Sequence, residues 1–264
     1  MELLKQLREM TGAGMVDCKK ALDEANGDLS AAVEILRKKG IAKSAKRADR
    51  ETSEGVVAVA VNADATEGYA IEVDSETDFV SRSDKFQDFV AKALELVKQS
   101  KPANVEELLS LDMNGLTVAD TLNTLSGIIG EKLAVKNLAV LSGATVACYS
   151  HLGGRIGVLV AIDASGKQTE AVDVAMQVAA SNPKYLVPAE VSIEEMDKEK
   201  EIYREQLVKE GKPEAMVEKI LEGKMAKYYS EVCLMEQEFI KDDKKKVKEV
   251  LGGANVSAFV RFSL

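Results

Sequence analysis

Two short stretches of this sequence bring together residue types that can act on a ligand or a partner. One is T-D-F-V at Thr77–Val80, where a carboxylate stands beside a large aromatic ring. The other surrounds His151, the single histidine of the chain, which follows Cys148 by three residues. Carboxylates, imidazoles and thiols move protons, attack carbonyls and bind metals, so each stretch is a candidate for that chemistry.

The histidine stretch is a poor catalytic or metal site. Zinc is held by clustered cysteines and histidines, but Cys18, Cys148 and Cys233 lie far apart and form no C-x-x-C pair. Alternation along a strand would also put Cys148 and His151 on opposite faces. We therefore expect no bound metal, no cofactor and no enzymatic activity. We interpret the cysteines as buried thiols and, on its residue type alone, His151 as a turn or partly buried residue.

The sequence also lacks a loop that would bind a nucleotide directly. A phosphate-binding loop needs Ser or Thr after its Gly-Lys pair, whereas the Gly-Lys pairs at 166, 211 and 223 are followed by Gln, Pro and Met. The glycines at 153, 154 and 157 lead into an expected strand, and a dinucleotide fingerprint would instead follow a strand and open a helix. We expect no direct nucleotide binding.

Asp78 and Phe79 have an ordinary structural explanation. Phe79 would pack beneath the helix that follows, and Asp78 would cap a turn. On the residues alone we favour this interpretation over a functional one.

The charge balance favours a protein or small-molecule partner over a nucleic acid. The 264 residues include 35 basic and 44 acidic side chains, a net charge of -9 at pH 7, which disfavours binding to a phosphate backbone. A basic run from Arg37 to Arg50 could touch RNA, although a solvated linker is the commoner explanation, so we expect no DNA or RNA ligand. No long apolar run and no signal-peptide pattern occurs, which predicts a cytoplasmic protein that does not bind membranes.

Residues 1–40 predict a small domain of three short helices. Apolar residues recur at helical spacing in three blocks that are separated by glycine-containing turns. Asp28 is placed to cap the third helix, and Gly40 is placed to end it. Residues 41–54 then predict a basic linker.

The remainder predicts an α+β core built from two similar subdomains. Each is expected to contain two strands followed by a helix, and the similar strands G-V-V-A-V-A-V and I-G-V-L-V-A-I favour an internal duplication. The predicted subdomains span 55–141 and 142–264, with strands at 55–61, 69–73, 144–150 and 155–163 and helices after Ser83 and at 169–180.

Two further features are predicted within the second subdomain. Apolar residues at spacings of three and four predict an antiparallel helical hairpin at 192–229. Alternating residues at 256–264 predict a final strand, which follows a helix around 243–251. The segments 105–111, 118–129 and 131–140 have helical or mixed spacing and are left unassigned.

Two motifs resemble the signatures of a known family. Residues 7–22, L-R-E-M-T-G-A-G-M-V-D-C-K-K-A-L, resemble the N-terminal signature of the bacterial translation elongation factor Ts family. Residues 72–81, E-V-D-S-E-T-D-F-V-S, resemble its second signature, and the two agree in order and separation. The stretch after His151, the hairpin and the closing strand are also similar, so the resemblance covers essentially the whole chain.

The resemblance implies a guanine nucleotide exchange factor that binds elongation factor Tu carrying GDP, expels the GDP and leaves the partner free for GTP. It implies an N-terminal domain similar to ubiquitin-associated domains, which docks on the partner, and a wedge formed by T-D-F-V near the partner's magnesium site. Assembly is left open between a dimer and a heterotetramer. The partner-binding residues implied in this way are Arg8, Met15, Val16, Thr77, Asp78, Phe79, Val80, Ile129, Gly130 and His151.

The chain departs from the family pattern at two of these regions. Val16 stands where a second methionine is common, which keeps apolar area but loses a flexible thioether. Asp74 stands where asparagine is usual, which adds a negative charge near the wedge. Two rival hypotheses stay open: a non-catalytic adaptor that binds ubiquitin-like or other proteins through its N-terminal helices and its hairpin, and a metal-free enzyme that uses His151.

Overall fold

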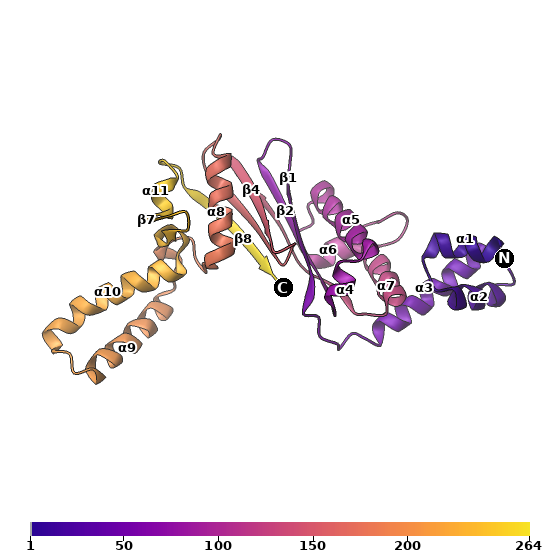
Figure 1. Cartoon of the computed structure of the whole chain (residues 1–264), viewed down its shortest axis with the longest axis horizontal. Coiled ribbons are helices and arrows are strands. Elements are labelled where there is room, and N and C mark those ends of the chain that lie inside the picture. Colours follow the sequence, from indigo (N-terminus) through magenta and orange to yellow (C-terminus); the bar gives the residue numbers. More distant parts are fainter. Residues whose placement is uncertain (1) are drawn as a thin grey trace.

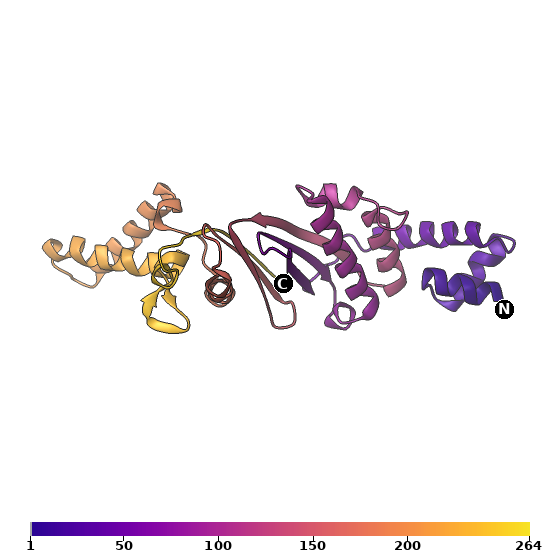
Figure 2. The same ribbon diagram turned by 90° about the horizontal axis from the view of Figure 1, so that it is seen from above.

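The protein is elongated, with helices at both ends and two sheets between them. The computed structural model describes residues 2–264, except for the side chains of residues 214 and 215. Three N-terminal helices form one end, a helical hairpin forms the other, and the sheets with their covering helices lie in the middle (Figure 1). The view from above shows the same order along the long axis (Figure 2). The mixed content of helices and antiparallel sheets agrees with the predicted α+β class.

The N-terminal unit is a bundle of three helices around a small core. Leu7, Cys18 and Ala32, one from each helix, are fully buried where the helices meet. The carboxylate of Asp28 accepts a hydrogen bond from the amide N–H of Ala31 at 3.0 Å, so it caps the third helix as predicted. The helices are α1 (Glu2–Thr11), α2 (Met15–Glu24) and α3 (Leu29–Ala45).

The third helix does not end at Gly40, so that expectation was wrong. Helix α3 continues to Ala45 because Gly40 is buried against another helix, α7 (Val118–Ile129). A Cβ atom at Gly127 of α7 would lie 2.6 Å from the Cα atom of Gly40, so only glycine allows this approach. The first residues of the predicted linker are therefore helical and lie on the core.

A three-stranded antiparallel sheet of order β1-β2-β3 forms the first half of the core. Its helices cover one face, where Phe86 and Leu108 are fully buried together with Ile71 of the central strand. The third strand lies in a segment whose spacing left it unassigned. The new elements are β1 (Glu54–Val61), β2 (Glu67–Ser75), α4 (Asp78–Ser81), α5 (Asp84–Ser100), α6 (Val105–Ser110) and β3 (Leu133–Ser142).

The second half of the core has the same order of elements. Two hairpin strands are followed by a helix, and a strand from much later in the chain pairs with the central strand, giving the order β4-β5-β8. Val174 and Val178 of the helix pack with Val158 and Val160 of the sheet. The elements are β4 (Thr145–His151), β5 (Ile156–Ile162), α8 (Gln168–Ser181) and β8 (Val256–Ser263).

The two sheets pack against each other through the faces that their helices leave free. Gly157 of β5 lies against β1, where a Cβ atom would come within 2.3 Å of a methyl carbon of Val57. The amide N–H of Val57 also donates a hydrogen bond to the carbonyl of Gly154 at 2.7 Å. A glycine on β5 therefore lets the two halves of the core meet closely.

The predicted helical hairpin is present, and its base is held by a partly buried polar contact. The carboxylate of Glu195 accepts hydrogen bonds from the hydroxyls of Tyr185 and Tyr228. The surrounding elements are η1 (Pro188–Glu190), α9 (Ile193–Lys209), α10 (Glu214–Val232), η2 (Leu234–Glu236), β6 (Glu238–Phe239), β7 (Asp242–Lys246) and α11 (Val247–Val250).

The helix expected around 243–251 is present only in the second part of that segment, so the expectation was wrong for residues 243–246. Residues 243–246 belong to strand β7, which pairs with β6, and the helical turn α11 covers Val247–Val250. The charged run at 241–246 has no apolar side chain to bury on a helix face, and Val247 and Leu251 alone are fully buried.

Two carboxylates are buried on β2, on the face away from its helices. Glu72 and Asp74 are 1% and 3% exposed, and the Nζ atom of Lys136 on β3 lies 3.3 Å and 3.5 Å from their oxygens. Burial raises the pKa of the Asp74 carboxyl and the charge of Glu72 adds to this, while Lys136 opposes it. The folded protein thus holds a proton on Asp74 more tightly than the unfolded chain does.

We predict that Asp74→Asn stabilises the protein at neutral pH. Because the folded-state pKa is raised, the free energy of unfolding falls as the pH rises from the ordinary aspartate pKa near 4 through the raised folded-state pKa, and the loss persists at pH 7. An amide does not ionise, so the variant should melt roughly 2 to 4 °C higher at pH 7 and show little difference near pH 3.5. Thermal melting at both pH values measures this.

The matched control for this prediction is Asp88→Asn, the same change at an exposed carboxylate that pairs with Lys92 one turn later. It should leave the melting temperature nearly unchanged at both pH values. A lower melting temperature of Asp74→Asn at pH 7 would show that the pairing with Lys136 outweighs the burial of the charge.

Candidate partner-binding site

The T-D-F-V stretch forms an exposed tip, defined here as residues 77–80, on the first half of the core. Asp78–Ser81 make a single helical turn, α4, between β2 and α5. The side chain of Phe79 is 85% exposed, whereas Val80, the next residue, is buried in the core. The interpretation in which Phe79 packs beneath the following helix is therefore wrong, and the ring that is fully buried there is Phe86 of that helix, α5.

Two acidic side chains hold the base of the tip to the loop that follows α7. The carboxylate of Glu131 accepts hydrogen bonds from the amide N–H of Thr77 at 3.0 Å and from its hydroxyl at 2.7 Å. The carboxylate of Glu76 accepts one from the amide N–H of Lys132 at 2.6 Å and contacts the guanidinium of Arg50 at 3.1 Å. The hydrogen bond from the backbone N–H of Lys132 contributes most to lowering the pKa of Glu76, and Arg50 adds to it. The carboxylate of Glu76 therefore stays charged, and the base of the tip stays attached.

The carboxylate of Asp78 is partly exposed and has a replaceable partner. It pairs with Arg82, one helical turn later, at 3.1 Å. Such an exposed pair contributes only about 0.3–0.5 kcal/mol, so a partner group could take the place of Arg82 at little cost. The tip therefore offers an apolar ring and an available carboxylate side by side.

Ile129 and Gly130 lie directly before the loop that holds the tip. Gly130 ends α7 in the left-handed conformation, with φ at +94°, and Ile129 packs partly buried against the core of the first half. The following residue is Glu131, which binds Thr77. The structure thus brings this pair to the tip, although it lies about fifty residues later in the sequence.

His151 lies on a separate exposed turn at the end of β4, in the second half of the core. Its ring stacks on Tyr149 with the ring centroids 5.8 Å apart, and its Nδ1 atom lies 3.1 Å from the Tyr149 hydroxyl oxygen. The next residue, Leu152, is 66% exposed with φ at +50°, which is uncommon for leucine. Sequence reasoning missed Leu152, because the two glycines after it indicated a turn but not the exposure of an apolar side chain.

The N-terminal bundle presents an apolar surface at the start of α2. Met15 and Val16 are 57% and 67% exposed, and Met10 at the end of α1 is 66% exposed. Arg8 and Met15 line a shallow hollow of about 320 Å³. Sequence analysis missed Met10, since its helical spacing with Leu7 suggested a shared buried face whereas only Leu7 is buried.

Among residues 2–264, no three or more His, Cys, Asp or Glu side chains are placed to hold a metal ion. Cys148 is only half-buried, so the expectation of three buried thiols was wrong for this residue, while Cys18 and Cys233 are buried as expected. Burial raises the pKa of the Cys148 thiol, which disfavours a nucleophilic thiolate.

The helices give no sign of a membrane span. Within the same described residues, each helix is too short or too polar to cross a bilayer.

Comparison with known proteins connects these surfaces to one family. Residues 76–264 match the family described as "Elongation factor TS". This range includes the tip, residues 77–80, and all of the core that follows it. The whole chain is 45% identical to "Elongation factor Ts" of Deinococcus deserti over 264 residues, which is 100% of this chain and 99% of the relative. Because the similarity extends over the N-terminal bundle as well as the core, the chain belongs to the elongation factor Ts family.

Proposed function

We propose that this protein is a guanine nucleotide exchange factor that binds elongation factor Tu, disturbs its magnesium and phosphate site and promotes release of GDP for exchange with GTP. The observation that carries the proposal is the exposed ring of Phe79 on a one-turn helix whose base is held by Glu131 and Glu76. An apolar ring held in water at a fixed position is suited to insertion into another protein.

The proposed mechanism needs no covalent step and no cofactor on this chain. A magnesium ion neutralises negative charge on the phosphates of a bound nucleotide, so displacing the groups that hold the ion weakens the grip on GDP. Phe79 would supply bulk at that place, and the carboxylate of Asp78 would compete with acidic or polar groups of the partner. Binding of the exchange factor and of the nucleotide must oppose each other reciprocally, so incoming GTP releases the factor.

Two further contacts complete the proposed site. The apolar surface of Met15 and Val16 would dock on the partner, with Arg8 beside it. The exposed turn with His151, together with Ile129 and Gly130, would contact the phosphate-loop side of the partner. In this proposal the protein acts in the cytoplasm without being an enzyme, and it binds no nucleotide, nucleic acid or membrane itself.

The adaptor hypothesis rests on the same N-terminal surface, because exposed Met10, Met15 and Val16 could bind a ubiquitin-like fold. It assigns no role to the tip. The two functions therefore differ in what Phe79 does, and that difference can be measured.

We predict that Phe79→Ala abolishes most of the exchange activity without harming the fold. The ring is 85% exposed, so its removal should change the melting temperature by less than about 2 °C. Loss of the ring should slow the stimulated release of fluorescent GDP from elongation factor Tu by about tenfold or more, as expected for a lost anchor worth about 1.5–3 kcal/mol. Stopped-flow fluorescence measures the release rate.

Phe86→Ala is the contrasting variant, because that ring is fully buried. It should lower stability by about 3–5 kcal/mol. Wild-type stimulation by a folded Phe79→Ala protein would exclude the wedge, and failure of the unaltered protein to bind elongation factor Tu or speed GDP release would favour the adaptor.

We predict that Val16→Asp weakens docking on the partner and leaves the action of the tip on GDP release intact. A charge on the apolar surface must be desolvated when the surface is covered, so the protein concentration that gives half-maximal GDP release should rise about tenfold. The maximal release rate at saturation should stay close to that of the unaltered protein. Titration of the exchange factor against a fixed amount of fluorescent GDP complex gives both values.

Val208→Asp is the matched control, because Val208 lies on the hairpin with a similar exposure of 64%, against 67% for Val16. It should leave both values unchanged. An equal effect of the two substitutions would mean that added charge, rather than the N-terminal surface, is responsible.

A further inference from the structure

Helix α3 belongs to two units of the molecule. Its first half packs in the N-terminal bundle through Ala32 and Leu36, and its second half crosses α7 on the core. The docking surface of Met15 and Val16 is therefore joined to the core mainly through one continuous helix.

The crossing of α3 and α7 is a contact of backbone on backbone. A Cβ atom at Gly127 would lie 2.6 Å from the Cα, 3.0 Å from the carbonyl oxygen and 3.2 Å from the carbonyl carbon of Gly40. Backbone atoms in the middle of a helix cannot move aside as a flexible side chain can, so a methyl group there must push the helices apart. The reverse addition is far milder, since a Cβ atom at Gly40 would meet the Cα of Thr124 at 3.4 Å.

Polar contacts on both sides of the glycines set the direction of the crossing. Before them along α3, the guanidinium of Arg37 donates to the carboxylate of Asp120. After them, the hydroxyl of Ser44 donates to the side-chain oxygen of Asn123 at 2.8 Å. Further along, the guanidinium of Arg47 donates to the carbonyl of Ser126 at 3.2 Å.

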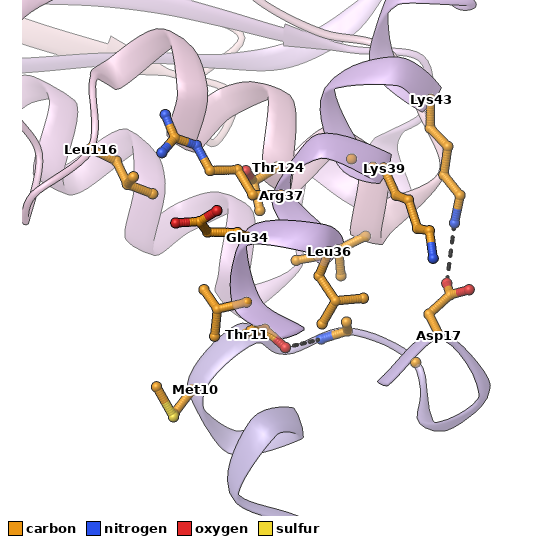
Figure 3. A pocket seen from close by; sticks show the side chains of 16 residues that line it. Met10, Thr11, Asp17, Glu34, Leu36, Arg37, Lys39, Lys43, Leu116 and Thr124 are labelled. Atoms are coloured by element: carbon orange, nitrogen blue, oxygen red, sulfur yellow. Dashed lines mark hydrogen bonds and ion pairs between the residues drawn. The ribbon is translucent and has the colours of Figure 1, made fainter. Parts of the chain in front are cut away.

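Beside the crossing, the bundle and the core are separated by a hollow. Its volume is about 350 Å³, with Met10 and Thr11 on the side of the bundle and Leu116 and Thr124 on the side of the core (Figure 3). A direct link from α1–α2 to the core is the hydrogen bond from Lys85 Nζ to the carbonyl of Gly12 at 3.0 Å. The hollow leaves room for the bundle to change its angle if the crossing loosens.

We propose that Gly40 and Gly127 are positioning residues: their close crossing sets the distance and angle between the docking surface at Met15–Val16 and the tip at Phe79, so that both engage one partner molecule together. The inference rests on the proposed exchange function. When two contacts are rigidly linked, forming the first places the second at high effective concentration. A tilted bundle would still dock on the partner, but the ring of Phe79 would then no longer lie at the partner's binding position for it.

The test compares three alanine variants of the full chain. Gly127→Ala adds the clashing methyl, Gly40→Ala adds one at ordinary contact distance, and Gly223→Ala adds one in helix α10 where no atom lies within 4 Å. Nitroxide labels on Lys20→Cys and Lys92→Cys, in a Cys148→Ser background, report the distance from bundle to core by pulsed electron spin resonance. Fluorescent GDP release from elongation factor Tu gives the maximal rate and the half-saturating concentration.

Gly127→Ala should shift or broaden the label distance and lower the maximal release rate about tenfold, with a smaller change in the half-saturating concentration. Gly40→Ala and Gly223→Ala should match the unaltered protein in every measurement. A loss of fold would instead reduce the active fraction, which thermal melting detects. Asp120→Asn, which weakens the crossing without adding an atom, should cause a smaller change of the same kind.

A folded Gly127→Ala protein with an unchanged label distance overturns the proposal, and so does one with a changed distance and the full maximal rate. If Gly127→Ala does not fold, an unchanged distance and rate in Asp120→Asn overturn it. Failure of the unaltered protein to release GDP would defeat the proposed function, whereas the label distances would still report whether the glycines fix the bundle.

Discussion

The hydrogen bonds from Thr77 to the carboxylate of Glu131 connect the tip to a loop 54 residues later in the chain. A single helical turn is not stable alone in water, so Phe79 keeps a defined position only while this contact and the buried side chain of Val80 persist. Leaving a phenylalanine in water forgoes about 1.5–3 kcal/mol of burial. The same chain buries Phe86 completely, so the exposure of Phe79 reflects a specific local construction that a partner's surface could complete.

The rest of the structure extends this local arrangement over a long molecule. The core of two facing sheets is closed by Gly157 against Val57, and it supports the loop that holds the tip. Helix α3 then carries the N-terminal apolar surface outward from the same core, across the contact of Gly40 with Gly127. Glycines thus allow both close contacts, between the two sheets and between α3 and α7, for one reason. The absence of a side chain lets the two elements approach closely, and backbone atoms move less than side chains do.

Local signals predicted much of the fold, and they failed where distant contacts decide. Asp28 caps α3 as predicted because capping depends on neighbouring amides. The end of that helix was misplaced, since glycine stops a helix in isolation but allows close packing when a second helix lies against it. Strand β3 was not assigned because its pairing partner, β2, lies more than fifty residues earlier. The charged segment before Val247 forms a strand because β6 offers hydrogen-bond partners.

The sequence by itself determined the α+β class, the three N-terminal helices, the hairpin and, through two motifs, the family resemblance and the residues that carry it. Each of these depends on neighbours within a few turns or on spacing along the chain. Only the tertiary structure decided that Phe79 is exposed while Phe86 is buried, and that Ile129 and Gly130 lie next to Glu131, which binds the tip, while His151 lies on another turn. The physical reason is that exposure and proximity depend on how separate elements pack, and residue types alone do not encode that arrangement in any local pattern.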